Sequence, residues 1–294
     1  MTSTSDSAVV ESGTYAFLVD DVRQVYHVHG QGPVMIAHSG GPGIAYGYLR
    51  APELEKHFTM VYLEPVGSGA SGRLSDPHGY TTSTYARFVA AVAEHLGVRR
   101  PFVLGHSHGG FVAQRYALDF PDRLAGLVLY DTSPTTGPEF DEDNAANVQA
   151  YLRRYPDQPE AAELPAAFSR LDAATDDVAY STALRDSVPI YFADFWSRRS
   201  EYAPMQAGVK ATLDPRRAPA QEFFDVRGKL GTIDVPTVIL VGRYDFICSP
   251  RFAVMLHNEI KGSRLVVFER SGHFAHIEQP EEFAKAVCEA MLPG

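Results

Sequence analysis

Apolar and polar residues alternate near the start of the chain and then give way to short, wholly apolar runs. Between Gly13 and Gly30 the period is two residues, with Tyr15, Phe17 and Val19 on one face, which predicts two antiparallel strands. The later apolar runs predict buried parallel strands at 34–37, 59–63, 102–104, 124–130, 237–241 and 265–268. The first two of these runs end in glycine-rich segments, as strands do before a turn into a helix.

Apolar residues at steps of three and four mark amphipathic helices between these strands. The first such stripe ends near Gly97 and consists of Tyr85, Phe88, Val89, Val92 and Leu96. A second helix is closed by Pro121, and two more are expected at 252–260 and 280–291. Strand, helix and strand in this order require a parallel sheet with helices over its faces. We therefore predict an α/β fold with a mostly parallel central sheet.

The regular pattern stops in the middle of the chain. From 132 to about 229 no clean strand pattern appears, while prolines, acidic residues and aromatic residues such as Tyr191, Phe195 and Trp196 are frequent. We expect a core formed by residues 10–131 and 231–294, with residues 132–230 inserted as a mostly helical cap. The aromatic residues of the cap are candidates for binding an apolar substrate, although such residues as often form the interior of a lobe.

Composition and charge narrow the classes of partner. The net charge of −10 and the sequence pI near 5.5 would repel nucleic acid and anionic lipid, and no run of Lys or Arg offsets them locally. No apolar stretch approaches the ~20 residues needed to cross a bilayer. The first eight residues lack the basic and apolar segments of a signal peptide. We expect a cytoplasmic protein that binds neither nucleic acid nor membranes.

The two cysteines and the glycine-rich segments do not indicate a cofactor. Cys248 and Cys288 lie far apart and fit neither a zinc spacing nor a secreted disulfide framework, although one bridge stays open; Cys288 is expected as a buried thiol. The Gly67-Ser-Gly segment lacks the spacing of a dinucleotide fingerprint. We expect neither a metal nor a cofactor, and a small molecule or a short peptide-like compound as substrate.

The strongest chemical signal is the segment Gly105-His-Ser107-His-Gly109, which matches the nucleophile elbow Gly-x-Ser-x-Gly. It lies between a predicted strand and a predicted helix, which is the context that the motif requires. Glycines on both sides of the serine remove the Cβ atoms that would collide with the neighbouring strand and helix. Ser107 is therefore the candidate nucleophile, presented at the carboxyl edge of the sheet.

A serine needs a base to accept its proton and an acid to orient that base. Asp245 follows the strand at 237–241, and His273 follows the strand at 265–268, so both lie at the edge of the sheet where Ser107 is expected. His276 is the rival base, but it is nearer the final helix. Asp131, at the end of another strand, is the rival acid. We predict a triad of Ser107, Asp245 and His273.

Attack on a carbonyl also requires donors for the developing oxyanion. The segment His38-Ser-Gly-Gly41-Pro-Gly43 directly follows the third strand, where glycines allow backbone N–H groups to approach the charge. We expect the backbone N–H of Gly41 as the first donor, with Gly40 as the alternative, and that of His108 as the second. His38 is expected to hold the loop by hydrogen bonding.

Taken together, these residues resemble the α/β-hydrolase superfamily and, within it, the prolyl aminopeptidase-like branch, also called proline iminopeptidase-related. Three segments carry the resemblance to the branch: Gly40-Gly-Pro-Gly43, Gly242-Arg-Tyr-Asp245 followed by Cys248, and Gly67-Ser-Gly-Ala-Ser71. Two segments depart from it, because Ser39 stands where the branch has its signature histidine and Glu64-Pro-Val66 replaces Asp-Gln-Arg. The resemblance implies recognition of a free α-amine by carboxylates of the cap, for which Asp194, Glu222 and Asp225 are the candidates.

Three hypotheses about function follow. The resemblance favours a serine hydrolase that cleaves amides through an acyl-enzyme, as an aminopeptidase or amidase does. The aromatic cap and the departures at Ser39 and Glu64 favour an alternative, an esterase, thioesterase or lactonase that acts on a small apolar acyl compound, such as a biosynthetic intermediate. Candidate substrate-binding residues are Tyr191, Phe195, Trp196 and Glu222.

The third hypothesis is a binding protein on the same fold, and the intact triad argues against it. A serine at the elbow excludes the usual mechanism of epoxide hydrolases and dehalogenases, which needs a carboxylate there.

Overall fold

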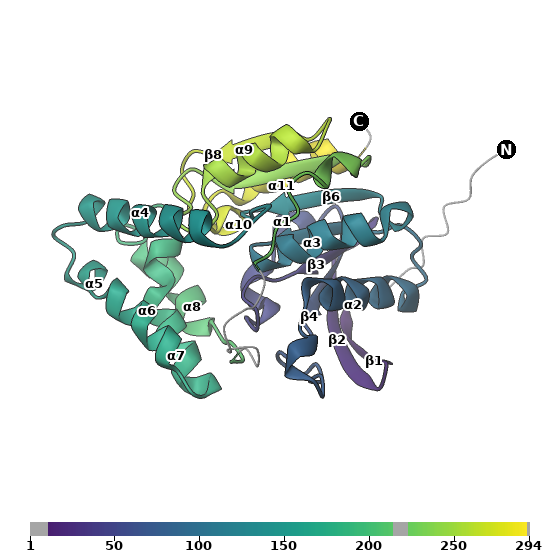
Figure 1. Cartoon of the computed structure of the whole chain (residues 1–294), viewed down its shortest axis with the longest axis horizontal. Helices are drawn as coiled ribbons and strands as arrows, with labels where there is room; N and C mark the ends of the chain where they lie inside the picture. The colour runs from purple at the N-terminus through teal and green to yellow at the C-terminus, as the bar shows by residue number, and fades with distance from the viewer. Residues whose placement is uncertain (1–10, 214–222, 293–294) are drawn as a thin grey trace.

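A computed structural model describes residues 11–213 and 223–292 of the chain. An eight-stranded sheet forms its centre, in the order β1-β2-β4-β3-β5-β6-β7-β8 (Figure 1). The strands are β1 (Gly13–Val19), β2 (Val22–His29), β3 (Val34–His38), β4 (Thr59–Glu64), β5 (Phe102–His106), β6 (Gly126–Tyr130), β7 (Thr237–Gly242) and β8 (Arg264–Phe268). β1 and β2 form an antiparallel pair, β2 pairs antiparallel with β4, and the strands from β4 to β8 run parallel. The predicted fold class is confirmed.

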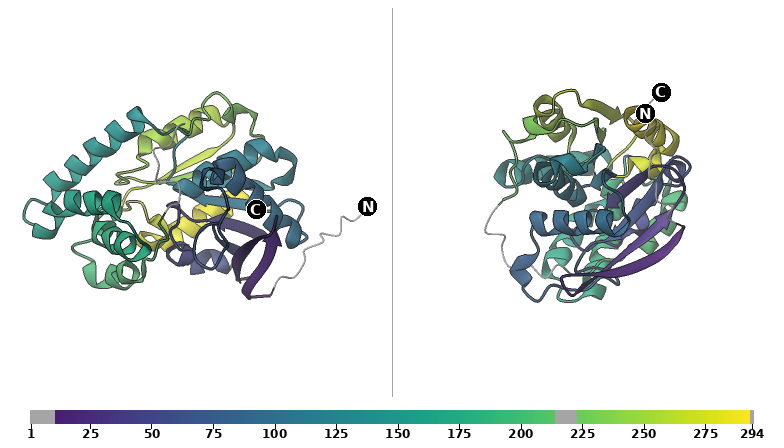
Figure 2. Two further views of the ribbon diagram at one scale, coloured as in Figure 1. Left: turned by 60° about the horizontal axis from the view of Figure 1, so that its bottom comes forward. Right: turned by 90° about the vertical axis from the view of Figure 1, so that its right-hand side faces the viewer.

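Helices cover both faces of the sheet, as the two views of Figure 2 show. Successive residues of β3 point to opposite faces: Ile36 packs with α2, α3 and α9, whereas Met35 and Ala37 pack with α1 and α11. These helices are α1 (Pro52–Glu55), α2 (Thr82–His95), α3 (His108–Asp119), α9 (Pro250–Glu259) and α11 (Pro280–Met291). Both faces are therefore buried, which explains why the parallel strands are continuous apolar runs in the sequence.

The helix that the apolar stripe predicted before Gly97 is α2. Thr81 caps it by accepting a hydrogen bond from the backbone N–H of Thr84, and the stripe residues Tyr85, Phe88 and Val92 are buried in the core. Two short helices, α1 and α10 (Ala275–Glu278), were not predicted, because four residues are too few to show a helical period. Single-turn 3-10 helices are η1 (Tyr46–Leu49), η2 (Pro77–Gly79), η3 (Pro121–Arg123), η4 (Val188–Tyr191) and η5 (Leu230–Thr232).

Between β6 and β7 the chain leaves the sheet and forms a group of helices to one side of it (Figure 1). They are α4 (Pro138–Arg154), α5 (Pro159–Ala162), α6 (Leu164–Ala173), α7 (Asp177–Ser187) and α8 (Arg199–Gly208). We call residues 132–230 the cap segment. Its interior is aromatic: Phe192, Phe195 and Tyr202 are almost fully buried, and they pack against Phe274 of the core. Phe140 and Ile190 of the cap segment likewise pack against core residues that follow β7, so the cap segment and the core share apolar contacts in several places.

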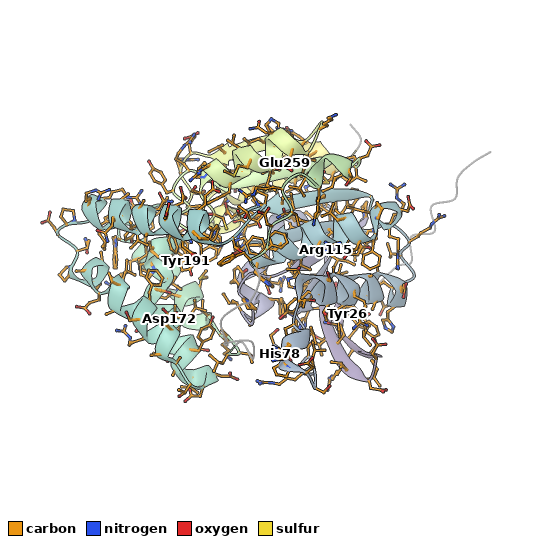
Figure 3. All side chains as sticks on the ribbon, in the orientation of Figure 1. Tyr26, His78, Arg115, Asp172, Tyr191 and Glu259 are labelled. Atoms are coloured by element: carbon orange, nitrogen blue, oxygen red, sulfur yellow. The ribbon has the colours of Figure 1, made fainter. Side chains whose placement is uncertain are left out.

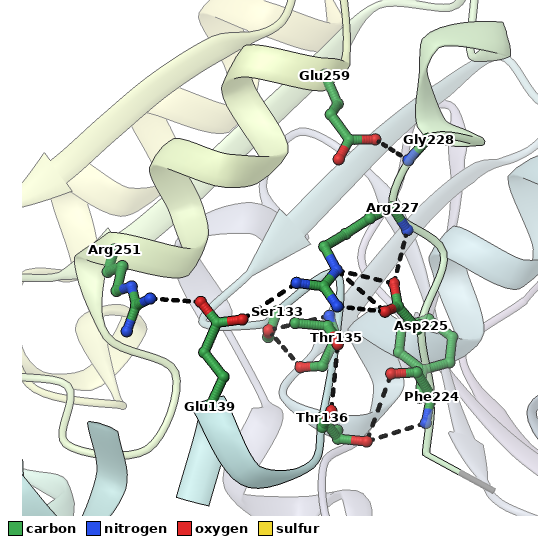
Figure 4. Close-up of polar contacts among 10 residues, drawn as sticks. All are labelled: Ser133, Thr135, Thr136, Glu139, Phe224, Asp225, Arg227, Gly228, Arg251 and Glu259. Carbon is green, nitrogen blue, oxygen red and sulfur yellow. Dashed lines mark hydrogen bonds and ion pairs between the residues drawn. The ribbon is translucent and has the colours of Figure 1, made fainter. Parts of the chain in front are cut away.

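The two connections of the cap segment lie side by side (Figure 4). Thr136 on the way out donates its backbone N–H to Phe224 O at 2.8 Å, and Val226 on the way back donates to Pro134 O at 3.0 Å. Glu139 then forms ion pairs with Arg227 of the returning connection and with Arg251 of α9. Each exposed pair is worth little alone, so the backbone ladder is the main link between the two connections.

Two further findings concern the membrane and the cysteines. In the part of the chain that the structure describes, every helix is too short or too polar to cross a membrane. Cys248 and Cys288 are both free thiols, the first buried and the second partly exposed.

Candidate active site

Ser107 lies at the turn between β5 and α3, and its backbone is strained. Its φ is 55° and its ψ is −121°, a conformation that costs a non-glycine residue about 1–3 kcal/mol. The flanking glycines explain how the turn can close, because a Cβ on Gly105 would lie 2.2 Å from Gly109 O. The Ser107 N–H donates to Tyr130 O at 3.0 Å, and Ser107 O accepts from Gly110 N–H and Thr132 Oγ1–H. The surrounding bonds hold the hydroxyl at the strand end.

Asp245 and His273 meet at the same edge of the sheet. Asp245 follows β7, His273 follows β8, and the His273 Nδ1–H donates to Asp245 Oδ2 at 2.8 Å. The other oxygen, Asp245 Oδ1, accepts from the backbone N–H groups of Ile247 and Cys248 at 2.9 and 3.1 Å. Both side chains are buried. These contacts orient the imidazole, and His273 and Ser107 line one cavity.

The loop after β3 supplies the candidate oxyanion donors. The Gly40 N–H is already donated, to Tyr48 Oη at 2.7 Å. The Gly41 N–H donates no hydrogen bond within residues 11–213 and 223–292, and its φ of +111° lies in the region that favours glycine. His108 is the first residue of α3, so its backbone N–H lies at the N-terminus of the helix, which is the positive end of the helix dipole. Of the two glycines, the geometry favours Gly41 as donor.

Hydrogen bonds of His38 and His106 hold the loop after β3 in place. His38 is buried, and its Nδ1–H donates to Ser39 O at 2.9 Å. Burial lowers the pKa of His38 to about 4, so the ring is neutral. His106 accepts from Tyr48 Oη–H on Nδ1 at 2.7 Å and donates from Nε2 to His273 O at 2.9 Å. One chain of hydrogen bonds thus joins the Gly40 loop to the His273 loop.

The two rivals from the sequence have other partners. His276 donates from Nε2 to Tyr48 O at 2.8 Å and accepts from Tyr130 Oη–H on Nδ1 at 2.8 Å. Its ring therefore has no nitrogen left for Ser107. Asp131 does lie beside the triad: it is fully buried, and its Oδ1 accepts from the Gly242 N–H at 2.9 Å.

The cavity around Ser107 has a volume of about 220 Å³ and lies between the core and the cap segment. Among the residues that the structure describes, no Asp, Glu, Lys or Arg lines this cavity. The apolar and aromatic lining residues are Pro42, Ile44, Tyr48, Leu171, Tyr180, Leu184, Val188, Tyr191, Met205, Val209, Ile247 and Phe274. The remaining ones are Gly40, Gly41, His106, Ser107 and His273. The cavity is therefore small, and its described walls are mainly apolar and aromatic.

The substrate-binding residues expected from the sequence occupy different places. Tyr191 lines the cavity, and Figure 3 labels it where the cap segment meets the core. Phe195 and Trp196 do not line it: Phe195 is buried in the cap interior, and Trp196 packs beside Tyr151 and Leu164. Glu222 lies outside the described residues.

The remaining amine-binding candidates do not reach the cavity either. Asp194 bonds to Ser197 within its own loop, and Asp225 is paired with Arg227 on the surface. The departures from the branch have structural roles instead. Ser39 Oγ donates to Ile44 O at 3.0 Å, and Glu64 bonds His27 at 2.8 Å as well as the Ala70 N–H.

A residue that the sequence did not indicate holds the His273 loop. Glu278, on α10, accepts the Gly272 N–H on Oε2 at 2.7 Å and the Ala193 N–H of the cap segment on Oε1 at 2.8 Å. Burial raises the pKa of Glu278 to about 8. An acid near an amphipathic helix normally faces solvent, so no signal in the sequence could single it out. Glu278 ties the cap segment to the loop that carries His273.

Comparisons with known proteins agree with the fold. The family described as "alpha/beta hydrolase fold" matches residues 33–280. A proline iminopeptidase of Saccharolobus solfataricus is 26% identical over 290 residues, which cover 93% of this chain and 89% of that protein. A 2-hydroxy-6-oxo-2,4-heptadienoate hydrolase of Pseudomonas putida is 29% identical over 264 residues, 87% of each chain. In structure, an alpha/beta fold family hydrolase from Bacillus anthracis aligns with a TM-score of 0.77 at 19% identity, over 95% of this chain and 99% of that one.

Proposed function

The chain belongs to the α/β-hydrolase fold family, and on that basis we propose that it is a serine hydrolase that cleaves esters of small apolar acyl groups through an acyl-enzyme. The observation that carries this proposal is the cavity, which combines Ser107 and His273 with walls free of charged side chains in the described residues. An uncharged wall gives no compensation to a buried ion, whereas it favours an apolar acyl chain by removing its surface from water.

In the proposed mechanism His273 accepts the Ser107 proton while the oxygen attacks the acyl carbon. The Gly41 and His108 backbone N–H groups stabilise the oxyanion, and His273 then protonates the leaving alcohol. Water, deprotonated by His273, releases the acid and restores the serine. Asp245 holds the imidazole in the right tautomer and stabilises the imidazolium in both halves, which fits its 2.8 Å bond to Nδ1.

In this proposal the cap segment forms one wall of the cavity. Leu171, Leu184 and Met205 come from three of its helices and line the same cavity as Ser107. Residues 132–230 would thus act as a cap domain that selects the acyl group, while residues 10–131 and 231–294 carry the chemistry. A volume of about 220 Å³ favours a short acyl chain, since drug-sized sites occupy roughly 300–1,000 Å³.

A second candidate is the hydrolysis of an amino-terminal residue, favoured by the similarity to proline iminopeptidases. This activity needs a negative partner for the free α-amine, because a buried ammonium without one is costly. Within the described residues, no carboxylate lines the cavity. The ester reading therefore has the better support from the site itself.

Two experiments separate the candidates. A fluorophosphonate probe should label the wild type and leave Ser107→Ala unlabelled, and absence of labelling in the wild type would favour a binding protein instead. A parallel screen would then measure kcat/KM for p-nitrophenyl acetate, butyrate and octanoate and for the p-nitroanilides of proline and alanine. We expect the short esters to be preferred, and faster turnover of either anilide would make the aminopeptidase reading correct.

A further inference from the structure

Asp131 is a buried carboxyl group beside the triad that the mechanism above does not use. It directly follows β6, with a left-handed φ of 45°, and its side chain is fully buried. Its Oδ1 accepts the Gly242 N–H at 2.9 Å, whereas its Oδ2 receives no N–H or hydroxyl donor from the described residues. A buried oxygen with no such donor needs an explanation.

The carboxyl group that neighbours Asp131 is that of Asp245. A ring nitrogen of His273 lies within 4.8 Å of an Asp131 oxygen, and the His273 Nδ1–H donates to Asp245 Oδ2 at 2.8 Å, so both acids lie beside the same imidazole. The donors are divided unequally between them. Asp245 receives three N–H groups, from Ile247, Cys248 and the His273 ring, while Asp131 receives only that of Gly242. Two adjacent buried carboxyl groups cannot both ionise at low cost, and the one with more donors keeps the charge. A proton on Asp131 Oδ2 would satisfy that oxygen by donating to Asp245.

We propose that Asp131 is a positioning residue of the triad, a neutral carboxylic acid whose O–H donates to Asp245 and holds that carboxylate against His273. This inference rests on the proposed function, because it assigns Asp131 a role through Asp245 and His273. The pair carries one proton and one negative charge. Burial, followed by the charge of Asp245, raises the pKa of Asp131 well above its usual range. The other titratable groups around it are Tyr130, His106, His273, Cys248 and Glu278.

A metal ion is the alternative occupant of this place, since single ligand atoms of His106, Asp131 and His273 lie within 4.8 Å of one another. However, both ring nitrogens of His106 are already in hydrogen bonds, with Tyr48 Oη and His273 O. His106 therefore has no nitrogen left for a metal. The shared proton satisfies Asp131 without breaking any of these bonds.

The kinetic test compares two substitutions of Asp131. Asp131→Asn keeps an oxygen for the Gly242 N–H and an amide N–H for Asp245, whereas Asp131→Leu keeps neither. We expect Asp131→Asn to retain kcat within about threefold of the wild type on p-nitrophenyl butyrate. Asp131→Leu should lower kcat by about 10²-fold, the loss typical of a misplaced catalytic group, with KM nearly unchanged because Asp131 does not line the cavity. A folded Asp131→Leu at the wild-type rate, or an Asp131→Asn as slow as Asp131→Leu, would overturn the proposal, as would loss of activity on treatment with EDTA.

An infrared measurement decides the matter without substrate and covers the case in which Asp131→Leu does not fold. The wild-type spectrum at pH 7 should contain the carbonyl stretch of a protonated carboxylic acid that Asp131→Asn lacks. Because Glu278 is expected to contribute a similar band, Glu278→Gln serves as the matched control that identifies it. If the wild type and Asp131→Asn have the same protonated-acid bands, Asp131 is ionised and the proposal fails. If Ser107→Ala keeps full esterase activity, the proposed function fails while the infrared result still stands.

Discussion

Replacing Glu278 with glutamine tests the link between the cap segment and the His273 loop. In the wild type both oxygens of Glu278 accept backbone N–H groups, those of Ala193 and Gly272. Glutamine can accept only one of them, and its NH₂ would face the other N–H. A buried donor left without a partner costs about 1–3 kcal/mol. For a chain of this size that corresponds to a fall in Tm of roughly 2–5 °C.

Activity should fall with stability, because Gly272 directly precedes His273 in the chain. The His273 N–H also donates to Tyr191 O at 2.6 Å, so the same loop is held to the cap segment at two points. We expect kcat for a short ester to fall by about tenfold or more, as for other losses of a group that orients a catalytic residue. The assay is thermal unfolding followed by circular dichroism, together with steady-state kinetics at one pH.

Glu269→Gln is the matched control, since it makes the same change at an exposed acid. Glu269 lies after β8, and its only described partner is Arg243 on the surface. We expect this variant to have the wild-type Tm and kcat. If Glu278→Gln were as stable and as active as Glu269→Gln, the two backbone bonds would not hold the His273 loop.

The pH dependence of stability gives a separate test of Glu278. Its pKa of about 8 in the folded protein lies above the usual value for glutamate, which applies to the unfolded chain. Between these two values the unfolded state releases the proton that the folded state retains, so stability falls as the pH rises from about 5 to 8. Relative to Glu278→Gln, the wild type should therefore be most stable near pH 5 and lose that advantage toward pH 8. A difference that grows with pH would reverse the sign and contradict the assignment.

Three further sets of substitutions have defined outcomes. Single replacement of Ser107, Asp245 or His273 by alanine should lower kcat/KM by at least about 10³-fold without loss of fold, and a variant near the wild-type rate would remove its residue from the triad. Tyr48→Phe removes the acceptor of the Gly40 N–H and the donor to His106, so Tm should fall by an amount that reflects about 1–3 kcal/mol and kcat should fall with it. Gly109→Ala would place a Cβ 2.2 Å from His38 O and should yield little folded protein, whereas Gly208→Ala, which meets no atom within 4 Å, should express normally.

The sequence predicted the sheet well because the parallel strands are buried on both faces. Their apolar runs are continuous, and the expected and observed strands differ by no more than two residues at either end. The strand expected at 124–130 shows how the two can differ. Leu124 is buried, but β6 begins only at Gly126, where the hydrogen bonds to the neighbouring strands start. Apolarity reports burial, whereas the start of a strand depends on its hydrogen bonds.

The candidate site was accessible to sequence reasoning only where local motifs exist. Ser107 belongs to a motif with a required spacing, and Asp245 and His273 follow strands whose carboxyl ends share an edge. The roles of Tyr48, Asp131 and Glu278 depend on contacts between elements more than 50 residues apart in most cases, such as the 2.7 Å bond from Tyr48 to His106. No periodicity records such contacts. The residues that line the cavity could not be predicted for the same reason. Some aromatic residues of the cap segment line the cavity and others lie in the cap interior, and the sequence does not distinguish them.

The paired connections of the cap segment have a consequence for how such proteins diversify. Because Thr136 bonds Phe224 and Val226 bonds Pro134, the two ends of the cap segment are joined to each other next to the core. An inserted segment of another length could be joined to the same two ends without altering β6 or β7, because the distance between the ends stays the same. Under the proposed function, recombination at these two ends would exchange the cap residues that line the cavity while β6 and β7 stay in place.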